Sequence, residues 1–161
     1  MKKTLMVYYS LNGNTACAAE FLGQYPEIDT ERLLVEKEPP KKGFGKFLLG
    51  GKSALMKQDP GLKPLTNDPE DYDNIIIGFP VWAGTYPPAI GAFLKRYGLK
   101  QKRIYVVACS ASGNADKAID HTRRATPECS HCGAVSLTDP LKNQEASFAK
   151  LRELADEIDK A

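Results

Sequence analysis

Apolar residues occur along this chain in two alternating patterns: short continuous runs, and longer stretches with helical spacing. Continuous runs bounded by polar residues or glycine are typical of strands that are buried on both faces of a parallel sheet. Residues 74–78 are such a run, and strands are predicted over residues 4–10, 30–35, 74–78, 103–109 and 134–137. The second segment contains charged residues, as an edge strand does.

Between these runs, apolar residues recur every three or four positions, as they do on one face of a helix. This spacing predicts helices over residues 14–24, 87–97, 114–124 and 146–160. Strands that alternate with helices build a parallel sheet with helices on both faces. We therefore expect a single α/β domain over residues 1–161, with a doubly wound sheet of five parallel strands.

Residues 39–69 interrupt this alternation after the second strand, and we interpret them as an irregular insert. Glycines and prolines are frequent there, and apolar residues such as Phe44 and Phe47 predict that the insert packs on the domain. Lysines crowd this part of the chain, at Lys37, Lys41, Lys42, Lys46, Lys52, Lys57 and Lys63. Such a cluster is either a solvated face or a surface for an acidic or phosphate-bearing partner.

Composition places the chain among globular proteins without a membrane span. Its 161 residues are 42% hydrophobic and 26% charged, and no apolar run is long enough to cross a bilayer. The apolar stretch after Lys2 and Lys3 is too short for a signal peptide, so we expect a cytoplasmic protein. Four cysteines then indicate free thiols rather than disulfides. The formal net charge of +2 is too small to indicate a nucleic-acid partner.

Three loops that are rich in small and polar residues follow the first, third and fourth predicted strands. Their sequences are SLNGNT at residues 10–15, FPVWAGTYP at residues 79–87 and CSASGN at residues 109–114. In open parallel sheets, ligands bind at the carboxyl ends of the strands. We therefore expect the three loops to converge on one binding site.

The first loop has the parts of an anion site. Gly13 allows a close approach or a left-handed turn, and the first amides of the next helix carry the positive end of its dipole. Ser10, Asn12, Asn14 and Thr15 add neutral donors, whereas a simple helix cap needs only one such residue. Because the loop contains no lysine or arginine, a phosphate there would be held by uncharged groups.

The second loop contains Trp82, the only tryptophan of the chain. It follows Pro80 in a loop and does not belong to a helical stripe. Trp82 either covers the core or stacks on a flat heteroaromatic ligand.

Other common motifs are absent or incomplete. No G-x-G-x-x-G follows the first strand, which excludes the usual dinucleotide site. The sequence GGKS at residues 50–53 is not a P-loop, because Lys46 stands where the first glycine is required. The sequence CSHC at residues 129–132 is compatible with an exposed turn, which we favour, with a redox-active dithiol, or with half of a metal site shared between chains. No paired carboxylates, metal-ligand set or nucleophile triad is visible in the three loops.

Together, S-x-N-G-N-T, P-V-W-A-G-T and C-S-A-S-G-N resemble the motifs of the flavodoxin family, in the same order and over nearly the whole chain. The resemblance implies a strand order of 2-1-3-4-5. It also implies FMN as cofactor, with its phosphate in the first loop and its ring between the other two. The FMN-binding residues implied in this way are Ser10, Leu11, Asn12, Gly13, Asn14, Thr15, Pro80, Val81, Trp82, Ala83, Gly84, Thr85, Tyr86, Ser110, Ala111, Ser112, Gly113 and Asn114.

The function that the resemblance implies is that of a low-potential electron carrier, in which the flavin carries the chemistry and no side chain is catalytic. Its partners would be redox proteins. The third loop has no stacking aromatic residue and the chain is slightly basic, and both features favour an alternative, an FMN-dependent NAD(P)H or quinone oxidoreductase. A flavin-free interaction module on the same fold is the third hypothesis.

Overall fold

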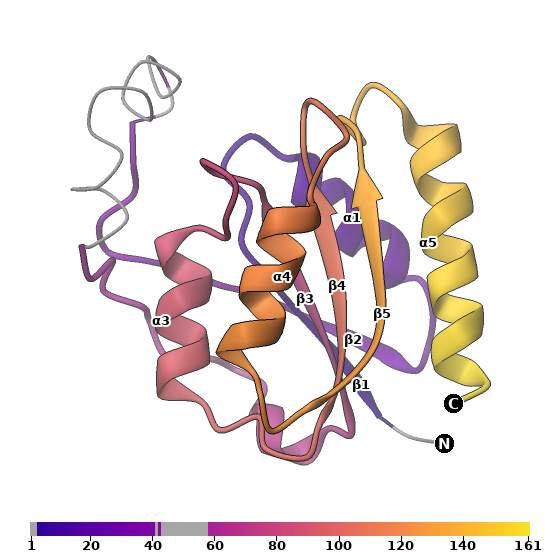
Figure 1. Ribbon diagram of the computed structural model, residues 1–161, viewed down its shortest axis with the longest axis horizontal. Helices are drawn as coiled ribbons and strands as arrows, with labels where there is room; N and C mark the ends of the chain where they lie inside the picture. Colours follow the sequence, from indigo (N-terminus) through magenta and orange to yellow (C-terminus); the bar gives the residue numbers. More distant parts are fainter. Residues whose placement is uncertain (1–2, 41, 43–57) are drawn as a thin grey trace.

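The computed structural model describes residues 3–40, 42 and 58–161 (Figure 1). Five parallel strands form one sheet in the order β2-β1-β3-β4-β5, as expected. The strands are β1 (Thr4–Tyr8), β2 (Ile28–Arg32), β3 (Asn74–Pro80), β4 (Arg103–Cys109) and β5 (Ser130–Leu137). All five parallel strands end at the same edge of the sheet, which brings the loops that follow them together.

Four α-helices of the described residues cover the two faces of this sheet, so the doubly wound α/β fold is confirmed (Figure 1). Two of them, α1 (Asn14–Leu22) and α5 (Gln144–Asp159), pack together on one face. The others, α3 (Pro88–Arg96) and α4 (Asp116–Ala125), lie on the opposite face. A short 3-10 helix, η1 (Pro69–Asp71), precedes β3. Among the described residues, no helix has both the length and the hydropathy that crossing a bilayer requires.

The alternation of side chains along the central strands divides the interior into two cores. In β3, Ile75 and Ile77 pack toward α3 and α4, whereas Ile76 packs toward α1 and α5, and all three are fully buried. Successive side chains in a strand point to opposite faces, so one continuous apolar run supplies both cores. Each such burial contributes on the order of 1.5–3 kcal/mol.

Gly78 in β3 lets the start of α1 pack close to the sheet. A Cβ added there would lie 2.6 Å from the Met6 methyl carbon, 3.1 Å from Tyr8 Cβ and 3.3 Å from Thr15 Cγ2. The missing side chain therefore brings the first turn of α1, with Thr15, directly over the carboxyl end of β3.

The second strand differs from its prediction. We expected residues 30–35, but β2 is Ile28–Arg32, and Val35 instead forms an isolated antiparallel bridge with Leu62. Leu33 and Val35 are buried, so their apolar character comes from packing on the α3 and α4 core rather than from the sheet. A short apolar run has the same appearance in the sequence whether it forms a strand or a buried loop, so the run alone did not predict the end of β2.

Residues 34–38, just before the insert, and residues 58–63, within it, lie together and form what we call the insert stem. Backbone amides of Glu36 and Lys37 donate to the carbonyls of Gly61 and Pro60, both at 3.0 Å, and Lys63 N donates to Leu34 O at 2.8 Å. The described lysines of this region, Lys37, Lys42 and Lys63, are exposed. The predictions for Lys41, Lys46, Lys52 and Lys57, and for the apolar residues Phe44, Phe47, Leu48, Leu49, Leu55 and Met56, lie outside the described residues.

The turn expected at residues 129–132 is wrong, because β5 begins at Ser130 and contains His131 and Cys132. The Cys129 thiol donates to Leu99 O at 2.8 Å on the α3 and α4 side. The Cys132 thiol interacts instead with Arg103 and Tyr105, whose ring packs on the α5 side. The two free thiols therefore lie on opposite faces of the sheet, so Cys129 and Cys132 are not placed to act together as a redox-active pair.

Candidate functional site

The three predicted loops meet at the carboxyl edge of the sheet around a hollow of about 220 Å³. Its lining residues are Ser10, Leu11, Asn12, Asn14, Thr15, Pro80, Val81, Trp82, Cys109, Ser110, Ala111 and Asp139. Every one of the three loops contributes to this lining, so their predicted convergence is confirmed. The other predicted residues, Gly13, Ala83, Gly84, Thr85, Tyr86, Ser112, Gly113 and Asn114, belong to the same loops but do not line the hollow.

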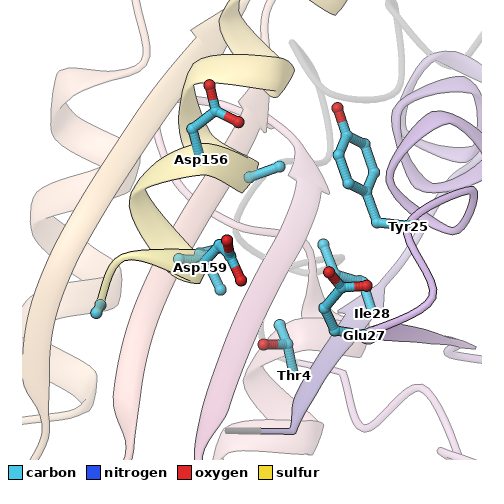
Figure 2. A pocket seen from close by; sticks show the side chains of 9 residues that line it. Thr4, Tyr25, Glu27, Ile28, Asp156 and Asp159 are labelled. Carbon is cyan, nitrogen blue, oxygen red and sulfur yellow. The ribbon is translucent and has the colours of Figure 1, made fainter. Parts of the chain in front are cut away.

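A larger hollow, of about 480 Å³, lies at the opposite edge, where β1 and β2 begin and α5 ends (Figure 2). Carboxylates of Glu27, Asp156 and Asp159 surround it together with Tyr25. Within the described part of the chain, no group of three or more histidine, cysteine, aspartate or glutamate side chains could hold a metal ion. Ligands of open parallel sheets bind at the carboxyl edge, so the smaller hollow is the candidate site.

Ser10 organises the first loop from inside. Its side chain is buried, and its hydroxyl oxygen accepts hydrogen bonds from the backbone amides of Gly13 and Ala16, both at 3.2 Å. Gly13 has a φ of 95°, a left-handed conformation that glycine adopts without strain, and it directly precedes α1. The loop therefore wraps around Ser10 and leads into the positive end of the helix dipole.

Thr15 carries a buried hydroxyl with no hydrogen-bond partner among the described residues. The residue is only 1% exposed and lines the hollow. Thr15 interacts with the thiol of Cys109, a weak partner, and lowers the pKa of that thiol. Burial is the larger effect and raises the pKa of Cys109 to about 11, so the thiol is neutral at pH 7. An unsatisfied buried hydroxyl costs about 1–3 kcal/mol, which makes Thr15 available to a ligand.

Two features of this site come from parts of the chain that the sequence did not indicate. Arg32, at the end of β2, donates from its guanidinium to the carbonyl of Ser10 at 3.0 Å and so brings a cation behind the first loop. The loop after β5 contributes Asp139 to the lining, and its Leu141 amide donates to Asn14 Oδ1 at 3.0 Å. Both lie at the carboxyl ends of strands, which is the signal that could have identified them.

The second loop makes a tight turn that presents its backbone at the rim. Trp82 N donates to Thr85 O at 2.9 Å and Thr85 N donates to Trp82 O at 3.0 Å. Between them, Ala83 and Gly84 both have positive φ, of 55° and 78°, as the central residues of a type I′ turn do. Trp82 is 5% exposed, packs with the α3 and α4 core and lines the hollow, so it covers the core and also offers a surface to a ligand.

The third loop is held by its own serines and by β5. The hydroxyls of Ser110 and Ser112 lie 3.0 Å apart, and the Ser136 hydroxyl donates to Gly113 O at 2.8 Å. Gly113 has a φ of 74°, and a Cβ there would lie 2.8 Å from Thr138 Oγ1. Gly113 packs closely against Thr138, and the members of this loop that line the hollow are Cys109, Ser110 and Ala111.

Residues 3–149 of the sequence match the profile of the family described as flavodoxin. The chain belongs to the flavodoxin family. Its loops after β1, β3 and β4 are thus the loops whose motifs resembled that family. None of the curated proteins is similar enough in sequence to match this flavodoxin-family chain.

Solved structures share the flavodoxin fold at low sequence identity. A Lactobacillus acidophilus flavoprotein in complex with FMN is 23% identical, with a TM-score of 0.68, and covers 90% of this chain and 98% of its own. A Bacteroides eggerthii protein, provisionally described as a flavoprotein, is 24% identical, with a TM-score of 0.75 and coverages of 96% and 99%. An azoreductase from Bacillus anthracis is 15% identical, with a TM-score of 0.54 and full coverage of both chains.

Proposed function

We propose that this chain binds FMN at the carboxyl edge of its sheet and acts as a low-potential electron carrier. The observation that carries the proposal is the buried Thr15 hydroxyl at the start of α1, which no described residue satisfies and which lies in a hollow that all three loops line. Membership of the flavodoxin family and the FMN complex of the Lactobacillus acidophilus flavoprotein support it. Bound FMN supplies the redox chemistry, and the protein binds and orients it.

The residues of the site fit a phosphate at the first loop. Thr15 and the first amides of α1 would donate to it, Ser10 would hold the loop in shape, and Arg32 would reinforce the loop from behind. The hollow of about 220 Å³ is smaller than the 300–1,000 Å³ of pockets that enclose a whole ligand. It therefore suits the phosphate end and one side of the ring, with the outer edge of the ring left open.

The charge around the hollow supports a low reduction potential. Asp139 is the one charged residue among those that line it, and no described lysine or arginine does so. The Asp139 carboxylate, which lines the same hollow, would disfavour the extra negative charge of a reduced flavin, and the buried Trp82 would exclude water that could solvate that charge. Both effects lower the potential.

A titration of the purified protein with FMN, followed by quenching of flavin fluorescence, tests the proposal. We expect saturable binding of FMN and clearly weaker binding of riboflavin, which lacks the phosphate. Equal affinities would remove the phosphate from the argument, and no quenching with excess FMN would refute FMN binding altogether and favour a flavin-free interaction module.

A second candidate function is that of an FMN-dependent NAD(P)H or quinone oxidoreductase. A groove of about 860 Å³ begins at Thr85 and Tyr86 in the second loop and continues past His121 and the cationic residues Lys95 and Arg96. Such a groove could admit an anionic substrate beside the ring, and the azoreductase relative favours the same class. Steady consumption of NADPH by the FMN-loaded protein with a quinone would establish the reductase, whereas reversible reduction without turnover would support the carrier.

We also infer a reducing compartment such as the cytoplasm. All four cysteines are free thiols, and Cys132 is exposed. Exposed free thiols persist where the surroundings keep them reduced.

A further inference from the structure

We propose that the insert stem takes part in FMN binding, because Glu38 orients Tyr9 and Tyr9 in turn positions Trp82. This inference rests on the proposed FMN site and assigns a role to a part of the chain that contributes no residue to the hollow. Glu38 and Tyr9 are positioning residues in this proposal, since they act through the indole.

Tyr9 connects three parts of the molecule. It follows β1, is 2% exposed and directly precedes Ser10, and its amide donates to Gly78 O at 3.0 Å. Its hydroxyl donates to Glu38 Oε2 at 2.8 Å. Its ring meets the Trp82 ring edge to face, with centroids 5.5 Å apart and planes at 88°. One side chain thus joins the insert stem, the first loop and the second loop.

The Glu38 carboxylate determines how the Tyr9 ring sits against the indole. A perpendicular aromatic contact depends on the tilt of both rings, and the phenol can change its tilt unless the hydroxyl is held at its far end. Burial and the Glu38 carboxylate both raise the pKa of Tyr9 above its ordinary value, so the hydroxyl remains a donor at pH 7. The bond to Glu38 therefore keeps the ring in one orientation.

A small cavity beside the indole lets it shift slightly if this support is lost. Trp82 lines the candidate hollow at the carboxyl edge and also a small cavity, of about 20 Å³, that it shares with Tyr9, Val35 and Ala89. This cavity is about the size that holds one water molecule. The stem itself is anchored by the bridge between Val35 and Leu62, and by Arg96, whose guanidinium donates to Leu62 O at 3.0 Å. A fixed stem can therefore transmit its position to the indole.

The chain offers a matched control for the hydrogen bond. Tyr72 is also buried, and its hydroxyl donates to Asp29 Oδ2 at the same 2.8 Å. Asp29 lies in β2 and Tyr72 just before β3, near the edge where the strands begin and away from the candidate site. Tyr72→Phe therefore removes an equivalent tyrosine–carboxylate bond without touching the indole.

The experiment compares Tyr9→Phe, Glu38→Ala, Glu38→Gln and Tyr72→Phe in the full chain. Emission of Trp82, the only tryptophan, reports its surroundings before FMN is added, and fluorescence titration then gives the FMN affinity. We expect Tyr9→Phe and Glu38→Ala each to shift the emission maximum and to weaken FMN binding roughly fivefold. The double variant should bind FMN no more weakly than either single variant, since both substitutions remove the same hydrogen bond. Glu38→Gln keeps an acceptor and should recover most of the affinity.

The outcomes separate this inference from the proposed function. If the unmodified chain does not bind FMN, the proposed function fails. The positioning of the indole is tested independently, because an unchanged Trp82 emission in Tyr9→Phe would refute it whether or not FMN binds. If the unmodified chain binds FMN, equal losses of affinity in Tyr9→Phe and Tyr72→Phe would overturn the inference, because they would reflect general destabilisation. Full affinity in Glu38→Ala would overturn it as well.

Discussion

Replacing Thr15 by valine should make the protein without FMN more stable and its binding of FMN weaker. Valine keeps the shape of the side chain, whose methyl carbon packs beside Gly78, and removes the hydroxyl that has no partner among the described residues. In the absence of ligand, this relieves a desolvation cost that is not offset by a hydrogen bond. We expect the free energy of unfolding to rise by about 1 kcal/mol.

The same substitution removes a donor to the phosphate. A hydrogen bond to a charged group contributes about 1.5–3 kcal/mol, which corresponds to a loss of roughly 10- to 100-fold in FMN affinity. Riboflavin has no phosphate, so its affinity should change little. The two effects of Thr15→Val therefore have opposite signs, which general damage to the fold would not produce.

Urea unfolding of the protein without FMN and fluorescence titration with FMN and riboflavin measure the three quantities. Thr15→Ser is the control, because it keeps the hydroxyl and should retain most of the FMN affinity. A fall in the stability of the FMN-free Thr15→Val variant would refute the reasoning, since it would mean that the hydroxyl is already satisfied, for example by the Cys109 thiol. Unchanged FMN affinity would remove Thr15 from the phosphate site.

Three further perturbations test other parts of the site. Asp139→Asn should raise the reduction potential of the bound flavin by about 20 mV, because a change of about 1 kcal/mol in the free energy of a two-electron reduction corresponds to that shift. An unchanged potential in a spectroelectrochemical titration would argue against this electrostatic effect. Trp82→Ala should lower the free energy of unfolding by about 3–5 kcal/mol, because the indole is buried, and should also lower the FMN affinity. Trp82→Phe should retain more of the stability. Thermal melts measure the effect on stability, and FMN titrations measure the effect on affinity. Burial raises the pKa of the Cys109 thiol from 9.0 to about 11, so the neutral thiol contributes about 2–3 kcal/mol of stability below pH 9, and this contribution is lost as the pH rises toward 11. Urea unfolding between pH 9 and pH 11 should therefore show a shallower decline of stability in Cys109→Ala than in the unmodified protein. Equal slopes would contradict the assignment.

The fold was predicted well from the sequence, because both the loop motifs and the apolar runs of the strands lie within short segments. The run NIIIG predicts a strand buried on both faces, and β3 (Asn74–Pro80) supplies both cores. The expected ends of elements were less accurate where tertiary contacts replaced the sheet. Val35 pairs with the returning insert instead of β1, and β5 begins at Ser130 because an edge strand accepts the polar residues of CSHC.

The candidate site was predicted only in part for the same reason. Ser10 and Thr15 follow directly from the motif after β1, whose spacing places them at the start of a helix. Arg32 and Asp139 reach the site from loops or strand ends that carry no motif, and their roles depend on which strands are neighbours. Neighbouring strands need not be adjacent in sequence.

The sequence alone determined the order of strands and helices, the polar loops at one edge and the glycine at the start of α1, because hydrophobic period and backbone freedom are properties of short segments. Only the tertiary structure decided that the Thr15 hydroxyl has no hydrogen-bond partner among the described residues, that Cys129 and Cys132 lie on opposite faces, and that Glu38 reaches Tyr9 beside Trp82. These facts depend on the register of distant strands and on the path of the insert, and no short segment encodes either.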